Sequence, residues 1–306
     1  MSSEARRRGV RDFLYDLLAG ILIGVAFIIP GFSGGSVAAI LGIYERLINA
    51  IAGLGREFKK NAFTLLPIAI GLVLGAVTLM LPLGYFLERF PLETVSVFIG
   101  LAIGGIPSML GRIKGKPTAN DIAAFSVPLV LAMLLCFIPA GADVNLFGIG
   151  FSGYVMLFFI GMLGSCALVI PGISGSMLLL ILGYYRPLVS LFSDHLLKLS
   201  DVGHSVLVLA VAGIGMLVGF FTVSVVMKHM LAKYPRGTFF AILGFIIGSL
   251  PAVYVSTMKD AGMISDSFRS VGLPTSPAYY ALCIFLVFIG VGASYFLTAI
   301  ADKEEE

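Results

Sequence analysis

Two short motifs of proline, glycine and serine recur in this chain of 306 residues: Pro30–Ser36, with the sequence PGFSGGS, and Pro171–Ser176, with the sequence PGISGS. Proline and glycine interrupt a helix, whereas serine and glycine are favoured where a new helix starts. The N–H groups of that first turn have no helical partner, and they favour an anion such as phosphate. We therefore predict a phosphate-binding site that contains Ser33, Gly34, Gly35, Ser36, Ser174, Gly175 and Ser176.

Two arginines follow the motifs within apolar sequence, Arg46 and Arg186. An arginine inside a membrane segment is a functional candidate, and its guanidinium group can pair with phosphate. On a straight helix, however, Arg46 would lie about 20 Å from Ser33, so a side chain that only reaches the membrane interface is an equal alternative. We interpret Glu45 as a counter-ion for Arg46, with proton coupling as the second possibility. Arg112 belongs to a basic cluster that either attracts lipid headgroups or, more simply, sets the topology.

The composition determines which elements must position these residues. Hydrophobic residues make up 58% of the chain and charged residues only 12%, and the mean hydropathy is +1.03. A water-soluble core cannot hide that much apolar surface, whereas the apolar segments are long enough to cross ~30 Å of hydrocarbon. We therefore predict an all-α, polytopic membrane protein. The three cysteines have no metal-ligand spacing, and we expect no disulfide, metal, cofactor or nucleic-acid partner.

The chain consists of two related halves. A shift of 141 residues places Ile28–Gly34 on Val169–Gly175, and a shift of 144 residues aligns a further series of glycines and prolines, including Gly71 with Gly215 and Gly75 with Gly219. This series indicates a duplication, which also favours anion binding at the motifs over a mere kink for close helix packing. The predicted domains are a basic tail (1–12), a first membrane repeat (13–152), a second repeat (153–302) and an acidic tail (303–306).

Each half begins with an interrupted pair of apolar segments and continues with three single ones. The pairs are 13–29 with 34–53 and 154–170 with 175–193; the single segments are 62–87, 92–111, 123–140, 206–231, 237–256 and 278–300. If each pair enters and leaves on one side as a re-entrant hairpin, the second repeat must be inverted. With a cytoplasmic N-terminus, fourteen lysines and arginines lie inside and four outside, as the positive-inside rule requires. Both termini are therefore predicted to be cytoplasmic, although segment length also permits a full-depth hairpin.

The first motif carries a resemblance to a known family. Ile29–Gly35 followed by Leu41–Ile48 resembles the signature of the bacterial polyprenyl-phosphate transporters, long catalogued as a domain of unknown function, and the similarity extends over residues 13–300. The resemblance implies a non-enzymatic flippase that returns undecaprenyl phosphate from the outer to the inner leaflet of the cytoplasmic membrane for cell-wall synthesis. Its partners would be this anionic lipid and the bilayer, and a homodimer is left open. In the second copy Arg186-Pro187 replaces Glu45-Arg46, so the halves need not be equivalent.

Two other functions are alternatives at this point. A membrane-embedded lipid phosphatase or pyrophosphatase would need a nucleophile beside an acid or base, but neither motif contains a carboxylate or histidine. A channel for small anions would need only helix starts and serines. The resemblance, rather than the spacing of the residues, makes us prefer a lipid substrate.

Overall fold

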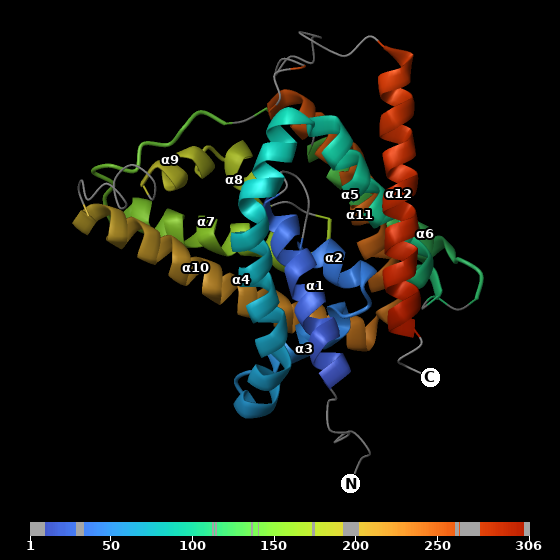
Figure 1. Cartoon of the computed structure of the whole chain (residues 1–306). Helices are drawn as coiled ribbons and strands as arrows, with labels where there is room; N and C mark the ends of the chain where they lie inside the picture. Colours follow the sequence, from blue (N-terminus) through green and yellow to red (C-terminus); the bar gives the residue numbers. More distant parts are fainter. Residues whose placement is uncertain are drawn as a thin grey trace.

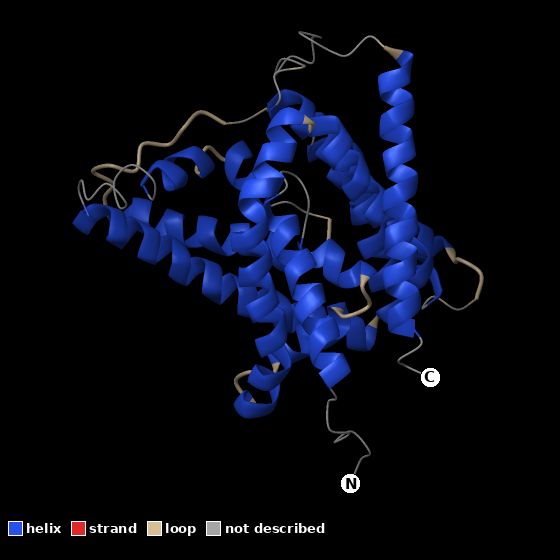
Figure 2. Ribbon diagram, viewed as in Figure 1, coloured by secondary structure: helices blue, strands red, loops and turns tan. Residues whose placement is uncertain are grey.

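The computed structural model describes residues 10–28, 34–111, 113, 115–135, 137–139, 141–172, 175–191, 202–260, 263 and 276–302. Every regular element of these described residues is a helix, which confirms the predicted all-α class (Figure 2). The helices of the first half are α1 (Val10–Ile28), α2 (Gly34–Ile40), α3 (Tyr44–Ala52), α4 (Phe58–Arg89), α5 (Pro91–Gly111) and α6 (Ala119–Leu135). Those of the second half are α7 (Phe151–Val169), α8 (Gly175–Ile181), α9 (Tyr185–Ser190), α10 (Val202–Lys233), α11 (Pro235–Asp260) and α12 (Pro277–Asp302).

Several helices are suited to a bilayer. Within the described residues, five are long and apolar enough to cross a membrane, namely those that contain 58–78, 91–111, 202–233, 235–258 and 277–296. Large apolar side chains project from their outer faces; on α12, for example, Phe285 and Phe288 are 59% and 68% exposed. Lipid rather than water is the solvent that such faces require. The protein is therefore a multi-pass membrane protein, as predicted.

Glycines allow α1 and α4 to touch along their backbones. A Cβ atom added to Gly20 or Gly24 of α1 would overlap the carbonyl oxygen of Ile68 or Leu72 of α4, respectively. Such close crossings through small residues are typical of helix pairs in membranes, where association depends on packing. Because both residue numbers rise by four from one contact to the next, α1 and α4 run in the same direction. The chain must therefore return between them, and the α2–α3 hairpin provides this return (Figure 1).

The helices α7 and α10 form the equivalent crossing in the second half. Here Gly215 lies against the carbonyl of Phe158, and Gly219 lies against that of Met162, so this pair is parallel as well. The α8–α9 hairpin lies between the two helices in the sequence. Both halves thus use the same device, a pair of parallel helices separated by a hairpin of short helices.

The remaining long helices pair across the two halves rather than within them. Gly100 of α5 meets the carbonyl of Val287 on α12, and Gly244 of α11 meets that of Phe125 on α6. These crossings are again parallel, because Gly104 meets Val291 and Gly248 meets Leu129, four residues further along each helix. The last helix of each half therefore packs on a helix of the other half (Figure 1).

The structure corrects one feature of the predicted hairpins. The segments 34–53 and 175–193, which the sequence analysis treated as single apolar arms, are each broken into two short helices. The break follows Leu41 in the first half and Leu182 in the second, where Gly42 and Gly183 adopt left-handed φ angles of 72° and 77°. In both copies two backbone hydrogen bonds close a Schellman turn, from Ile43 to Ala38 and from Gly42 to Ala39 in the first.

Candidate functional site

A buried ion pair fixes the first hairpin to α1. A guanidinium nitrogen of Arg46, in the first turn of α3, donates a hydrogen bond to the carboxylate of Asp16 on α1. The Asp16 side chain is fully buried, whereas that of Arg46 is 39% exposed. A buried carboxylate in a membrane protein requires such a partner, because an unpaired charge there costs several kcal/mol. The break at Gly42 therefore places Arg46 beside α1, and the 20 Å estimate for a straight helix does not apply.

The Arg46 guanidinium retains donors that the protein leaves unused. Its Nε atom is buried and has no hydrogen-bond partner among the described residues. An arginine has five N–H donors in a planar fork, and a buried donor without an acceptor costs about 1–3 kcal/mol. The site can therefore accept an additional acceptor with a matching geometry, such as a phosphate or carboxylate group.

Sequence reasoning missed Asp16. We proposed Glu45 as the counter-ion, because it is adjacent in sequence, but the structure gives Asp16 this role and places Glu45, half-buried, beside it in α3. A signal was present, since Asp16 is an acidic residue within the apolar segment 13–29. The shift of 141 residues also aligns it with Leu157, so the charge is a difference between the two halves.

The neighbour of Asp16 holds the turn of the same hairpin. The hydroxyl of Tyr15 donates a 2.7 Å hydrogen bond to the carbonyl oxygen of Leu41, at the end of α2. Carbonyl groups at the end of a helix lack a helical partner, and the tyrosine satisfies this one. Two consecutive residues of α1 thus bind the hairpin on either side of its break.

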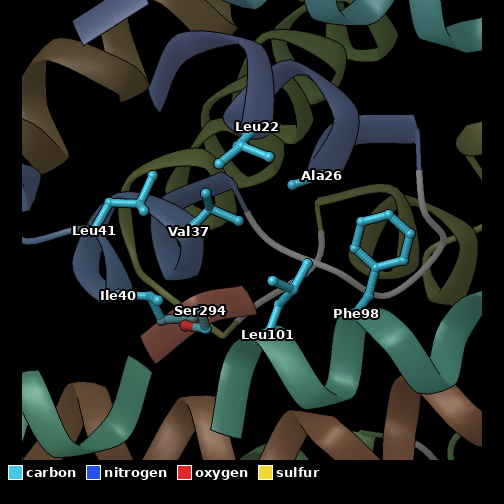
Figure 3. Close-up of a pocket in the computed structure, with 8 residues that line it drawn as sticks. All are labelled: Leu22, Ala26, Val37, Ile40, Leu41, Phe98, Leu101 and Ser294. Carbon is cyan, nitrogen blue, oxygen red and sulfur yellow. The ribbon is translucent and has the colours of Figure 1, made fainter. Parts of the chain in front are cut away.

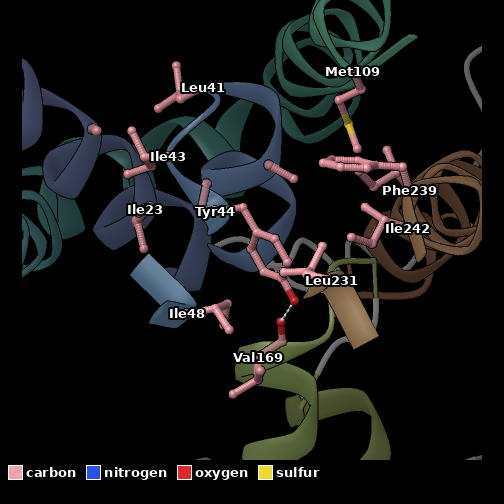
Figure 4. Close-up of a cluster of buried hydrophobic side chains, with 14 of the residues drawn as sticks. Ile23, Leu41, Ile43, Tyr44, Ile48, Met109, Val169, Leu231, Phe239 and Ile242 are labelled. Carbon is pink, nitrogen blue, oxygen red and sulfur yellow. Dashed lines mark hydrogen bonds between the residues drawn. The ribbon is translucent and has the colours of Figure 1, made fainter. Parts of the chain in front are cut away.

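A third contact joins the first hairpin to the second motif. Tyr44 of α3 is buried, and its hydroxyl donates a 2.8 Å hydrogen bond to the carbonyl of Val169, the last residue of α7 (Figure 4). Pro171 and Gly172 follow directly, and both are buried. Gly172 has a φ of 85°, and an added Cβ atom would overlap the backbone of Phe245 on α11. The second motif is therefore packed between α3 and α11.

The structure treats the predicted phosphate ligands differently. Gly34, Gly35 and Ser36 begin α2 and are buried, and Gly175 begins α8 in a half-buried position, followed by Ser176. Ser33, Ser174 and Arg112 lie outside the described residues. Arg186 is exposed on α9, a helix without a buried residue. Because α2 and α8 have seven residues each, they offer one turn of N–H groups rather than a long dipole.

These features define a multi-pass helical membrane protein with an ion pair at an intramembrane hairpin. The sequence matches the VCA0040-like family, described as undecaprenyl phosphate translocase-like, over residues 23–271. Because this match covers most of the chain, the protein belongs to that family, which confirms the resemblance noted in the sequence.

Two curated relatives match nearly the whole chain. A protein of Staphylococcus aureus is 31% identical over 299 residues, and one of Vibrio cholerae is 27% identical over 319 residues. Each alignment covers 95% of this chain and 98% of the relative, and both relatives are named polyprenyl-phosphate transporter. No solved structure matches this chain.

Proposed function

We propose that this protein is a flippase for a polyprenyl phosphate in the bacterial cytoplasmic membrane. It would move undecaprenyl phosphate from the outer to the inner leaflet, where the carrier lipid is reused for cell-envelope synthesis. The family and the names of both relatives support transport of this class of lipid. The observation that carries the proposal is the Arg46 guanidinium, which is held by Asp16 and keeps an unused donor.

The proposed phosphate site combines this arginine with the two motifs. A phosphate can accept parallel hydrogen bonds from the guanidinium fork and further bonds from N–H groups at the start of α2 and α8. Arg46 would provide the main charge, because the two helices are short. The other proposed ligands are Ser33, Gly34, Gly35, Ser36, Ser174, Gly175, Ser176 and the more exposed Arg186. Glu45 is then a candidate for ion coupling, and Arg112 for attracting headgroups.

The proposed topology has two inverted repeats and cytoplasmic termini. A short turn reverses the chain between α4 and α5 and again between α10 and α11. If α5 and α6 cross the membrane in opposite directions, the parallel pairs α5–α12 and α6–α11 make α7 and α10 run opposite to α1 and α4. The hairpins α2–α3 and α8–α9 would then be re-entrant from opposite sides. In Figure 1, α1 begins and α12 ends toward the lower side of the view, in agreement with this topology.

Cysteine labelling tests the topology. In a variant without Cys136, Cys166 and Cys283, an impermeant maleimide added to intact cells should label Asp143→Cys and Ser276→Cys. Both positions are exposed and lie in segments predicted to be outside. The control Glu57→Cys, in the exposed loop before α4, should react only after permeabilisation. Labelling of Glu57→Cys in intact cells would refute the inverted arrangement.

Substitution of Arg46 tests the substrate site. A charge-assisted hydrogen bond contributes about 1.5–3 kcal/mol, and lysine cannot reproduce the planar fork. We expect Arg46→Lys to bind a short-chain polyprenyl phosphate roughly ten-fold more weakly than the wild type, and Arg46→Ala to lose transport in proteoliposomes. Arg186→Ala, the matched variant in the second hairpin, should have a smaller effect. Wild-type binding by Arg46→Lys would instead identify the arginine as an interfacial anchor.

The same proteoliposomes separate the alternative functions. Release of inorganic phosphate from a polyprenyl pyrophosphate would indicate a phosphatase rather than a transporter. Flux of a radiolabelled small anion, without movement of lipid, would indicate a channel.

A further inference from the structure

An apolar pocket lies beside the proposed phosphate site (Figure 3). Its volume is about 390 Å³, counted with the space at its mouth. Leu22 and Ala26 of α1 lie on one side of it, Val37 and Leu41 come from the first hairpin, and Leu101 belongs to α5. Ser294 of α12 provides the polar atom at its edge, and the other lining residues are all apolar. Ligand sites typically have this size and this character.

The pocket is continuous with the groups that would hold the phosphate. Val37 directly follows Ser36 in α2, and both lie in the first turn of that helix. At the other end Leu41 lines the pocket with its side chain and accepts the Tyr15 hydroxyl with its carbonyl oxygen. Tyr15 precedes Asp16, the partner of Arg46. An apolar chain in the pocket would therefore have its polar end near these groups.

We infer that this pocket binds the first part of the isoprenyl chain of the lipid substrate. The inference rests on the proposed function, because it requires a ligand whose apolar chain is attached directly to a phosphate. A free phosphate or a small anion would leave the pocket unused. A lipid with a glycerol backbone would place a polar ester region where the lining is apolar, at a cost in desolvation.

Shape rather than hydrophobicity must provide the selectivity of this pocket. A hydrocarbon chain that leaves the bilayer for an apolar pocket gains little from the hydrophobic effect, because lipid is already an apolar solvent. What the pocket can add is close packing around a chain of matching shape. A methyl-branched isoprenyl chain should therefore bind better than a linear chain of the same length.

The test compares three ligands in nanodiscs: dimethylallyl phosphate, farnesyl phosphate and a linear alkyl phosphate with the same main-chain length as farnesyl. The wild type should prefer farnesyl phosphate over the linear compound. Ala26→Phe fills the pocket, and Leu101→Ala removes part of its wall. Because a methylene group in an apolar pocket changes affinity about 10-fold or more, both variants should lose roughly this much affinity for farnesyl phosphate. Binding of dimethylallyl phosphate should change little, since its chain is short.

Ile103→Ala is the matched control, because Ile103 lies two residues from Leu101 on α5 but is 37% exposed. It should bind all three ligands like the wild type. If Ala26→Phe and Leu101→Ala, folded as judged by gel filtration, retain the wild-type preference for farnesyl phosphate, the pocket is not the chain site. If the wild type binds none of these phosphates, the proposed function fails, and this inference fails with it.

Discussion

The hairpins α2–α3 and α8–α9 share one backbone design but differ in what holds them. Each begins with a helix of seven residues and turns at a left-handed glycine, Gly42 or Gly183. The first is bound to α1 by the Asp16–Arg46 ion pair, whereas Leu157 and Pro187 occupy the aligned positions in the second half. The duplication thus preserved the fold of the hairpin, but the charges that suit it to phosphate are concentrated in one copy.

The second hairpin is held instead by the backbone of the 141–146 segment. The N–H of Gly141 donates to the carbonyl of Leu180, at 3.1 Å, and the N–H of Val144 donates to that of Gly183, at 3.0 Å. A side chain on Gly183 would overlap the carbonyl of Ala142, so glycine is needed there twice over, for its φ and for this contact. These bonds fix position without placing a charge in the membrane, and a symmetric pair of phosphate sites is therefore not expected.

Removal of the ion pair should have the largest effect on this difference. Arg46→Leu leaves the buried Asp16 carboxylate without the arginine and should lower the free energy of unfolding by about 3 kcal/mol. Asp16→Leu should cost less, about 1 kcal/mol, because the Arg46 side chain is already 39% exposed and can reach water. The double variant imitates the apolar second half and should recover about 2 kcal/mol of the combined loss. Unfolding in mixed micelles measures all three.

Phosphate binding provides the second measurement on the same variants. We expect the double variant to be stable but unable to bind, because a hydrophobic pair can replace the ion pair in packing but not in charge. Additive losses of stability in the double variant would show that the two side chains do not interact energetically. Normal binding by the double variant would remove Arg46 from the site.

The tyrosines that begin α3 and α9 should give a smaller difference. Tyr44→Phe removes the hydrogen bond to the Val169 carbonyl and should lower the free energy of unfolding by about 1 kcal/mol. Tyr185, aligned with Tyr44 by the shift of 141, is 39% exposed. Tyr185→Phe should therefore change stability by no more than about 0.5 kcal/mol. Equal effects of the two substitutions would mean that the second hairpin is also anchored through its tyrosine.

Much of the fold could be predicted because its causes are local in sequence. Apolar length defined the long helices, and the repeated glycines that indicated a duplication are the residues at the helix crossings, such as Gly71 and Gly215. A repeat preserves these glycines because a larger residue would separate two backbones. The breaks at Gly42 and Gly183 were missed, since apolar periodicity continues through a Schellman turn.

The site could be predicted only in part, because its decisive contacts join residues far apart in the chain. Asp16 and Arg46 are 30 residues apart, and Tyr44 and Val169 are 125 residues apart. Sequence spacing favoured Glu45 as the counter-ion because adjacency is the only proximity that a sequence displays. The chemistry of the motif was readable, but the partner that positions Arg46 required the packing of α3 against α1.

The exchange of helices between the halves has a consequence for synthesis. The pair α1–α4 can form as soon as α4 has been made, and α6 finds its partner when α11 emerges. The glycine face of α5, in contrast, has no partner until α12, the last helix, has been translated. The wall of the apolar pocket that α5 and α12 share is thus the last part of the molecule to close. A ribosome must finish the chain before the membrane contains a complete binding site.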